Sequence, residues 1–157
     1  MKTFAALVLA VGLAACGGTS PEQFLETAQT EIAAGNFDAA AKASADGLAA
    51  GAAAATAWRL ELIGLEASAR AGKVDAALAT LERLAGAHPD RVKGALYVST
   101  AGQVKDSGDG AGAITILDAG AKRFPKDADV AKAIEQAKSA SEGSEEMEML
   151  RSLGYLD

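Results

Sequence analysis

The chain repeats one unit at a nearly constant spacing, and this repeat limits its possible folds more than any other feature. Gly72 opens a turn, an amphipathic segment follows, and Pro89 closes the unit. Gly72 and Gly108 are 36 residues apart, as are Pro89 and Pro125, and Gly35 precedes Gly72 by 37. A fixed period in the mid-thirties indicates stacked helix pairs in a solenoid, where each pair buries its apolar face on the next.

The composition favours packed helices and argues against several kinds of partner. Half of the 157 residues are hydrophobic but only 4% are aromatic, so alanine and leucine supply most of the apolar surface. Alanine is the best helix former, and a chain of this length is expected to form one domain. The formal charge of −6, with no basic stripe, argues against nucleic acid and against attraction to anionic lipid headgroups.

The first sixteen residues have the layout of an export signal. Lys2 precedes an uncharged run over residues 3–15, which is shorter than the roughly 20 residues that a membrane-spanning helix needs. The segment LAAC at 13–16 resembles the lipobox of bacterial lipoproteins, in which the cysteine is acylated and cleavage falls just before it. The alternative is an ordinary signal peptide with an incidental cysteine. Cys16 is the only cysteine, so the chain cannot form an intramolecular disulfide.

The lipoprotein resemblance implies where the protein is attached. Residues 1–15 would be the signal peptide, and Cys16 would carry the acyl chains at the start of a short tether, residues 16–20. In that family an aspartate after the cysteine often retains the protein at the inner membrane. Gly17 occupies that position. The resemblance therefore implies a lipid-anchored protein of the bacterial cell envelope, at the outer membrane and facing the periplasm.

Residues 21–140 are predicted to form the helical repeat domain. Ser20 and Pro21 are typical of a helix start, and Gly35-Asn36 is typical of a helix end. Apolar residues at helical spacing predict further helices over 37–49, 54–71, 74–87, 90–106, 111–124 and 127–140. Helices of this length are marginal alone in water, so each must bury its apolar stripe on a neighbour.

These helix pairs resemble the tetratricopeptide repeat family, whose repeat is about 34 residues long. The family's repeat-packing positions match Ala28, Ala40, Ala77, Leu81, Ala101, Ala113, Leu117 and Ala137. Pro89 and Pro125 match the closing proline, whereas Ser44 replaces a bulky residue and Leu84 replaces a small one. The resemblance implies an all-α, right-handed superhelical solenoid of antiparallel helix pairs, with about three and a half repeats over residues 20–140.

Residues 141–157 have two interpretations. The segment 141–144 breaks the preceding helix, and Met147, Leu150 and Leu153 then lie on one helical face. Because terminal repeats are usually atypical, the segment is expected to be a degenerate capping helix that closes the stack. The alternative is an exposed tail that docks to another protein.

The sequence offers little to catalysis or metal binding. His88 is the only histidine, it precedes Pro89 in a predicted loop, and no second histidine or free cysteine completes a zinc site or a catalytic pair. Residues 106–110 resemble a calcium loop only superficially, because carboxylates at alternate positions and a closing glutamate are missing. We therefore expect no enzyme activity, no cofactor and no metal.

A chain of this kind is expected to act by binding. In the tetratricopeptide family the first helix of each pair lines a concave groove. The resemblance implies these groove residues: Leu25, Gln29, Leu62, Ile63, Glu66, Arg70, Val98 and Lys105. Their mixture of apolar and charged side chains suits an amphipathic helix or an extended segment. The alternative for Leu62 and Ile63 is a place in the core.

Together these features predict a membrane-anchored scaffold or adaptor that presents a helical repeat surface to another protein of the cell envelope. The alternative is a structural or assembly subunit, similar to a pilotin, of an envelope machine built from several proteins. In both cases the membrane contact is made by the N-terminal lipid, and the partner is a protein rather than a nucleic acid.

Overall fold

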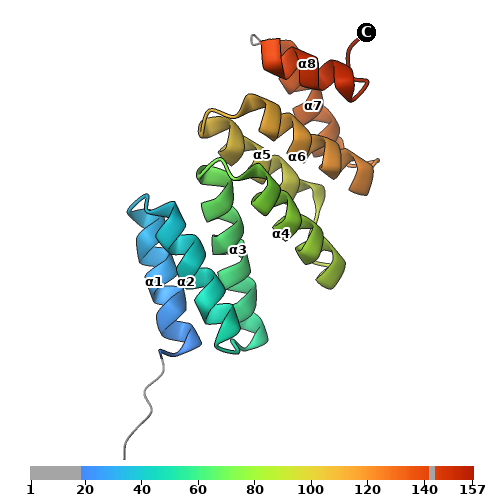
Figure 1. Cartoon of the computed structure of the whole chain (residues 1–157). Coiled ribbons are helices and arrows are strands. Elements are labelled where there is room, and N and C mark those ends of the chain that lie inside the picture. The colour runs from blue at the N-terminus through green and yellow to red at the C-terminus, as the bar shows by residue number, and fades with distance from the viewer. Residues whose placement is uncertain (1–18, 142–143) are drawn as a thin grey trace, which may run out of the picture.

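A computed structural model describes residues 19–141 and 144–157, and all regular elements in these residues are helices (Figure 1). Cys16 and the predicted signal peptide lie outside the described residues. The eight helices of the described chain confirm the predicted all-α fold. They are α1 (Pro21–Ala33), α2 (Phe37–Ala49), α3 (Ala54–Arg70), α4 (Val74–Ala87), α5 (Gly94–Asp106), α6 (Gly110–Arg123), α7 (Ala128–Ala140) and α8 (Ser144–Ser152).

Most helix boundaries follow the local sequence signals. At the start of α1, the Ser20 hydroxyl accepts a hydrogen bond from the Gln23 N–H at 3.3 Å, and the Gln23 side chain accepts one from the Ser20 N–H at 2.8 Å. This reciprocal pair satisfies two amide groups that the helix itself leaves free. Gly72 and Gly108, which follow α3 and α5, have φ angles of 68° and 98°. Glycine adopts this left-handed backbone without steric cost, so the repeated glycines end the first helix of each pair.

One predicted boundary is wrong, because the helix expected over 90–106 begins at Gly94. The N–H groups of Arg91 and Val92 both donate to the His88 carbonyl at 3.0 Å, so this segment forms a turn after α4. Val92 is only 1% exposed and holds the turn against the core. Burial of this one side chain therefore outweighs the helical pattern that the sequence shows before Gly94.

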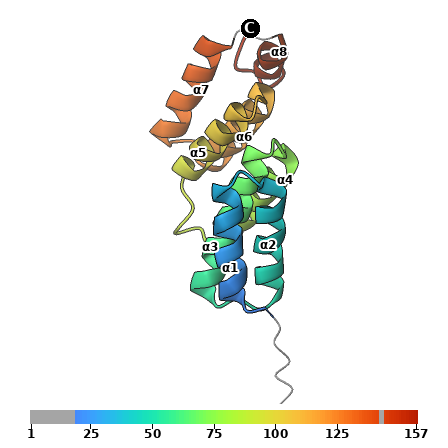
Figure 2. The same cartoon turned by 90° about the vertical axis from the view of Figure 1, so that its left-hand side faces the viewer.

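Each helix packs mainly on helices one or two places away in the chain (Figures 1 and 2). The first helices of successive pairs, α1, α3, α5 and α7, contact one another in that order, while α6 contacts both α4 and α8. Among the described residues, no substantial contact joins helices that are further apart. The helices therefore form an elongated row, with α1 at one end and α7 and α8 at the other (Figure 1).

Helix α3 connects two hydrophobic cores. The smaller core, from α1, α2 and α3, contains Leu25, Ala28, Ala43 and Leu60. The larger core starts at Leu65 on α3 and continues through α4, α5 and α6 to α7. Between the two cores, a Cβ at Gly64 would lie 3.4 Å from the Cβ of Ser44 on α2. The buried Ser44 hydroxyl has no hydrogen-bond partner in the described part of the chain, so the junction is less well satisfied than either core.

The residues expected to pack the repeats lie at helix contacts. Those that are buried are Ala28, Ala40, Ala77, Leu81, Ala101, Ala113 and Leu117. Ala137 on α7 is half-buried. Two glycines mark the closest approaches: a Cβ at Gly120 would lie 2.9 Å from the Tyr97 Cβ, and a Cβ at Gly47 would lie 2.8 Å from a Leu60 methyl carbon. The absence of a side chain at these positions lets the neighbouring helices approach this closely.

Tyr97 is the largest fully buried side chain and links three helices. Its hydroxyl donates to the Glu82 carboxylate of α4 at 3.1 Å, and its ring meets the ring of Phe124, after α6, edge to face at 5.7 Å. Burial, followed by the nearby negative charge of Glu82, raises the pKa of Tyr97 to about 12. The structure therefore holds this phenol in its neutral form.

We expect Gly120→Ala to destabilise the protein by about 1–3 kcal/mol, because the new methyl group would press on the Tyr97 Cβ. Urea unfolding followed by circular dichroism measures the change. The matched control is Gly86→Ala on α4, where nothing lies within 4 Å of the added Cβ. This control should stabilise the protein by about 0.5–1 kcal/mol, as alanine does in an exposed helix. Equal effects at both positions would contradict the close approach.

We also expect stability to depend on the ionisation of Tyr97 at high pH. The folded pKa of about 12 lies above the ordinary tyrosine pKa of 10.0. The neutral phenol therefore contributes stability below about pH 10, and this contribution is lost as the pH rises through about 12. Between about pH 9 and pH 11, the free energy of unfolding should fall more for the wild type than for Tyr97→Phe. Parallel pH profiles for the two proteins would refute this assignment.

Candidate functional site: an apolar cleft between three helices

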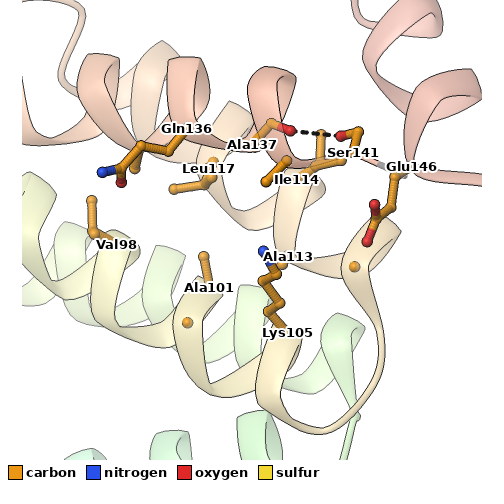
Figure 3. A pocket seen from close by; sticks show the side chains of 14 residues that line it. Val98, Ala101, Lys105, Ala113, Ile114, Leu117, Gln136, Ala137, Ser141 and Glu146 are labelled. Atoms are coloured by element: carbon orange, nitrogen blue, oxygen red, sulfur yellow. Dashed lines mark hydrogen bonds between the residues drawn. The ribbon is translucent and has the colours of Figure 1, made fainter. Parts of the chain in front are cut away.

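An open cleft of about 230 Å³ lies between α5, α6 and α7, with α8 at its edge (Figure 3). All three helices contribute apolar side chains. These are Val98 and Ala101 from α5, Ala113, Ile114 and Leu117 from α6, and Ala133, Ala137 and Ala140 from α7. The cleft is therefore an apolar recess that is open to solvent.

Small side chains and the position of α7 together create the cleft. Helix α7 packs on α5 and α6, whereas the substantial contacts of α8 among the described residues are with α6. If the row continued regularly, α8 would lie along α7 in the way that α6 lies along α5. Among the described residues α8 makes no substantial contact with α7, so Ala137 and Ala140 of α7 line the cleft instead of packing on α8. The Ser141 hydroxyl donates to the Ala137 carbonyl at 2.6 Å where α7 ends.

Helix α8 and the residues after it are held on α6 by apolar and polar contacts. Leu150 is fully buried. The Tyr155 hydroxyl donates to Asp118 Oδ1 of α6 at 3.1 Å. Within α6, Lys122 Nζ lies 2.7 Å from the other carboxylate oxygen of Asp118. Burial and the hydrogen bond to Asp118 raise the pKa of Tyr155. Of the two interpretations of residues 141–157, these contacts favour a helix that packs on the last complete pair.

Two opposite charges lie at the α8 end of the cleft, and an amide lies at the other end (Figure 3). Lys105 extends from the last turn of α5, and Glu146 extends from α8 beside it. The Glu146 side chain lies directly against Gly110, at the first position of α6. Gln136 of α7 lines the other end. The cleft thus has an apolar centre with polar groups at both ends.

The cleft contains two of the residues predicted to line a groove, Val98 and Lys105. The two predicted groove residues on α1 differ in their exposure to solvent. Gln29 is exposed, but Leu25 is 6% exposed and belongs to the smaller core. The assignment of Leu25 to a binding surface is therefore wrong, because this side chain packs inward with Ala28.

The four predicted groove residues on α3 lie outside the cleft. Leu62 is half-buried against the larger core, and Ile63 is half-buried against the smaller one. Both therefore contribute to packing, as their alternative interpretation held. Glu66 and Arg70 form an ion pair at 2.8 Å along the helix, and both side chains are partly exposed. The predicted residues therefore do not line one continuous groove, and the cleft that the structure contains lies between α5, α6 and α7.

Sequence reasoning missed the parts of the cleft that come from α6, α7 and α8, and one residue from α5. Ala101, Ala113, Leu117 and Ala137 were expected only to pack repeats together, yet they line the cleft as well. The signal for this was present, since three successive helices carry small residues at their packing positions and small residues leave space when helices diverge. Glu146 had no comparable signal, because its position depends on the packing of α8.

The residues that the structure describes contain no group of three or more side chains suited to hold a metal ion. Within those same residues, no helix is both long and apolar enough to cross a membrane. No family model, no curated protein and no solved structure matches the chain.

We expect Leu150→Ala to destabilise the protein by about 2–5 kcal/mol, because the truncation leaves a cavity between α8 and α6. Amide hydrogen exchange should show faster opening of α8 and of the facing surface of α6, while exchange in α1 and α2 stays unchanged. Leu153→Ala is the control, since Leu153 is only partly buried and should cost less. Equal costs at the two positions would show that α8 does not pack as described.

Proposed function

We propose that this chain is a lipid-anchored adaptor of the bacterial cell envelope, built as a tetratricopeptide-like solenoid. In this proposal, an acylated Cys16 attaches the protein to the outer membrane, facing the periplasm. The cleft between α5, α6 and α7 binds an amphipathic helix of another envelope protein. The observation that carries the proposal is the cleft itself, an apolar recess with polar groups at both ends.

Two observations support the solenoid. The turn glycines recur at intervals of 36 and 37 residues, and each is followed by a helix that packs on its neighbours in the row. In repeat proteins each unit contacts only the next, and the contacts between helices one or two places apart have this pattern. A right-handed superhelix of about three and a half repeats is the arrangement that we propose for these pairs.

The anchor is supported by the sequence of residues 1–16. A cation, a short apolar run and the LAAC segment occur in the order that bacterial lipoproteins use. Stable attachment takes more than one acyl chain, and lipoproteins of this type carry more than one. Helix α1 begins at Pro21, so few residues separate the proposed lipid from the folded domain.

The dimensions and lining of the cleft support a helical partner. An apolar cavity of about 150 Å³ is large enough to bind benzene. A cleft of about 230 Å³ therefore has room for one aromatic side chain, or for two aliphatic side chains that are one helical turn apart. A helix that lays its apolar face into the recess would bury both. Lys105 and Glu146 would then fix the direction of the partner, because they favour opposite charges on it.

Photocrosslinking in living cells tests the proposed partner site. A photoreactive residue at Gln136, which lines the cleft, should capture one envelope protein. The matched position is Ser139, which is exposed on the same helix and lies outside the cleft lining, and it should capture little. Ala133→Phe should fill the recess and reduce the Gln136 crosslink about tenfold, which corresponds to about 1.4 kcal/mol of binding free energy.

Two results would contradict the proposal. Equal capture from Gln136 and Ser139, or a Gln136 crosslink that Ala133→Phe leaves unchanged, would show that the cleft does not bind the partner. The anchor is tested separately by Cys16→Ser, which should move the protein from the membrane fraction to the soluble fraction because it removes the acylation site. Continued membrane attachment of this variant would refute anchoring by the lipid.

A further inference from the structure

The start of α1, the end of α2 and the start of α3 lie together at one end of the row (Figures 1 and 2). We call this surface, residues 20–22 and 47–59, the α1–α3 end. The Thr56 hydroxyl of α3 donates to the Glu22 carboxylate of α1 at 3.5 Å, which joins two of its parts. The cleft is lined by α5, α6 and α7. These helices lie toward the other end of the row (Figure 1).

One segment of the α1–α3 end is uncharged, whereas Glu22 and Arg59 on the same end are charged and exposed. Residues 47–58, GLAAGAAAATAW, contain no charged side chain, although the whole chain has a formal charge of −6. The exposed residues of this segment include Ala49, Ala50, Ala53, Ala54 and Ala55. Removing residues 47–58 from water therefore strips no charge of its hydration, so contact of this segment with a less polar phase carries little penalty.

An amphipathic cluster of side chains surrounds Trp58, the last residue of the segment 47–58. Trp58 is half-buried, the guanidinium carbon of Arg91 lies 4.0 Å from the centre of its ring, and the His88 ring meets it edge to face at 5.1 Å. Arg59 follows Trp58 and is exposed. Tryptophan concentrates at membrane–water interfaces, and arginine combines an apolar stem with a head that binds phosphate. The cluster therefore has the chemistry of a surface that meets phospholipid headgroups.

The chain outside the structure connects this end to the proposed lipid. Only residues 17–20 separate Cys16 from the start of α1. Five Cα–Cα steps at about 3.3–3.6 Å per residue span at most about 18 Å. If Cys16 is acylated, no other part of the molecule is held so near the bilayer. We propose that the α1–α3 end rests on the headgroup layer of the membrane, with Trp58 and Arg59 at the contact and Arg91 beside them.

This inference rests on the proposed lipid anchor and adds an orientation to it. The net charge of −6 gives no general attraction to an anionic bilayer, so the lipid supplies the attachment and the local surface supplies the orientation. The row of helices then points away from the membrane. The cleft, at the opposite end, is presented to proteins on the aqueous side.

Trp58 is the only tryptophan, so its fluorescence reports on this contact alone. The lipidated full-length protein is reconstituted into vesicles of phosphatidylethanolamine and phosphatidylglycerol, with or without a lipid that carries a nitroxide quencher on its headgroup. We expect the nitroxide lipid to reduce Trp58 emission about twofold, as contact at the interface requires. The double variant Arg59→Glu and Arg91→Glu should lose most of this quenching, because carboxylates repel lipid phosphates.

The matched control is the double variant Lys126→Glu and Lys132→Glu, which makes the same charge change at exposed positions between α6 and α7 and on α7. Its quenching should equal that of the wild type. Quenching is expressed relative to the same variant in vesicles without nitroxide, so changes in basal emission cancel. Protein that floats with the vesicles but shows no quenching overturns the orientation and leaves the anchor intact. Protein that does not float refutes the anchor, and the orientation with it.

Discussion

The fold depends on how closely its helices approach one another. At Gly120 and Gly47 the helix backbone passes so near Tyr97 and Leu60 that no side chain fits between them. Fully buried alanines such as Ala40 and Ala77 continue the same packing. Each such contact gains only a small dispersion energy, but many short contacts over long helices add up. A chain with 4% aromatic residues can therefore form a dense core.

Many of the helix boundaries were predictable because short sequence patterns that recur along the chain determine them. Only a few neighbouring residues are needed to recognise each of these patterns. They are the glycine turns, the capping residues around Ser20 and the apolar stripes. The start of α5 was mispredicted because it depends on the burial of Val92, which no local pattern reveals. Leu25 was misassigned for a similar reason, since inward and outward positions on α1 differ by a small rotation.

The candidate site was predictable only in part. Val98 and Lys105, which the sequence predicted as groove residues, line the cleft from α5. The cleft also requires that α8 lies on α6 rather than along α7. That choice is made by the contacts of Leu150 and Tyr155, which are remote in sequence from α5. The position of Glu146 follows from the packing of α8, so a site at the end of this row of helices depends on how the row is terminated.

The pattern of contacts has a consequence for how this chain folds. Because helices contact mainly those one or two places away, each contact closes a short stretch of chain. The entropy lost in closing a loop increases with its length, and proteins rich in local contacts fold fastest. Folding can therefore begin at several helix pairs and spread along the row.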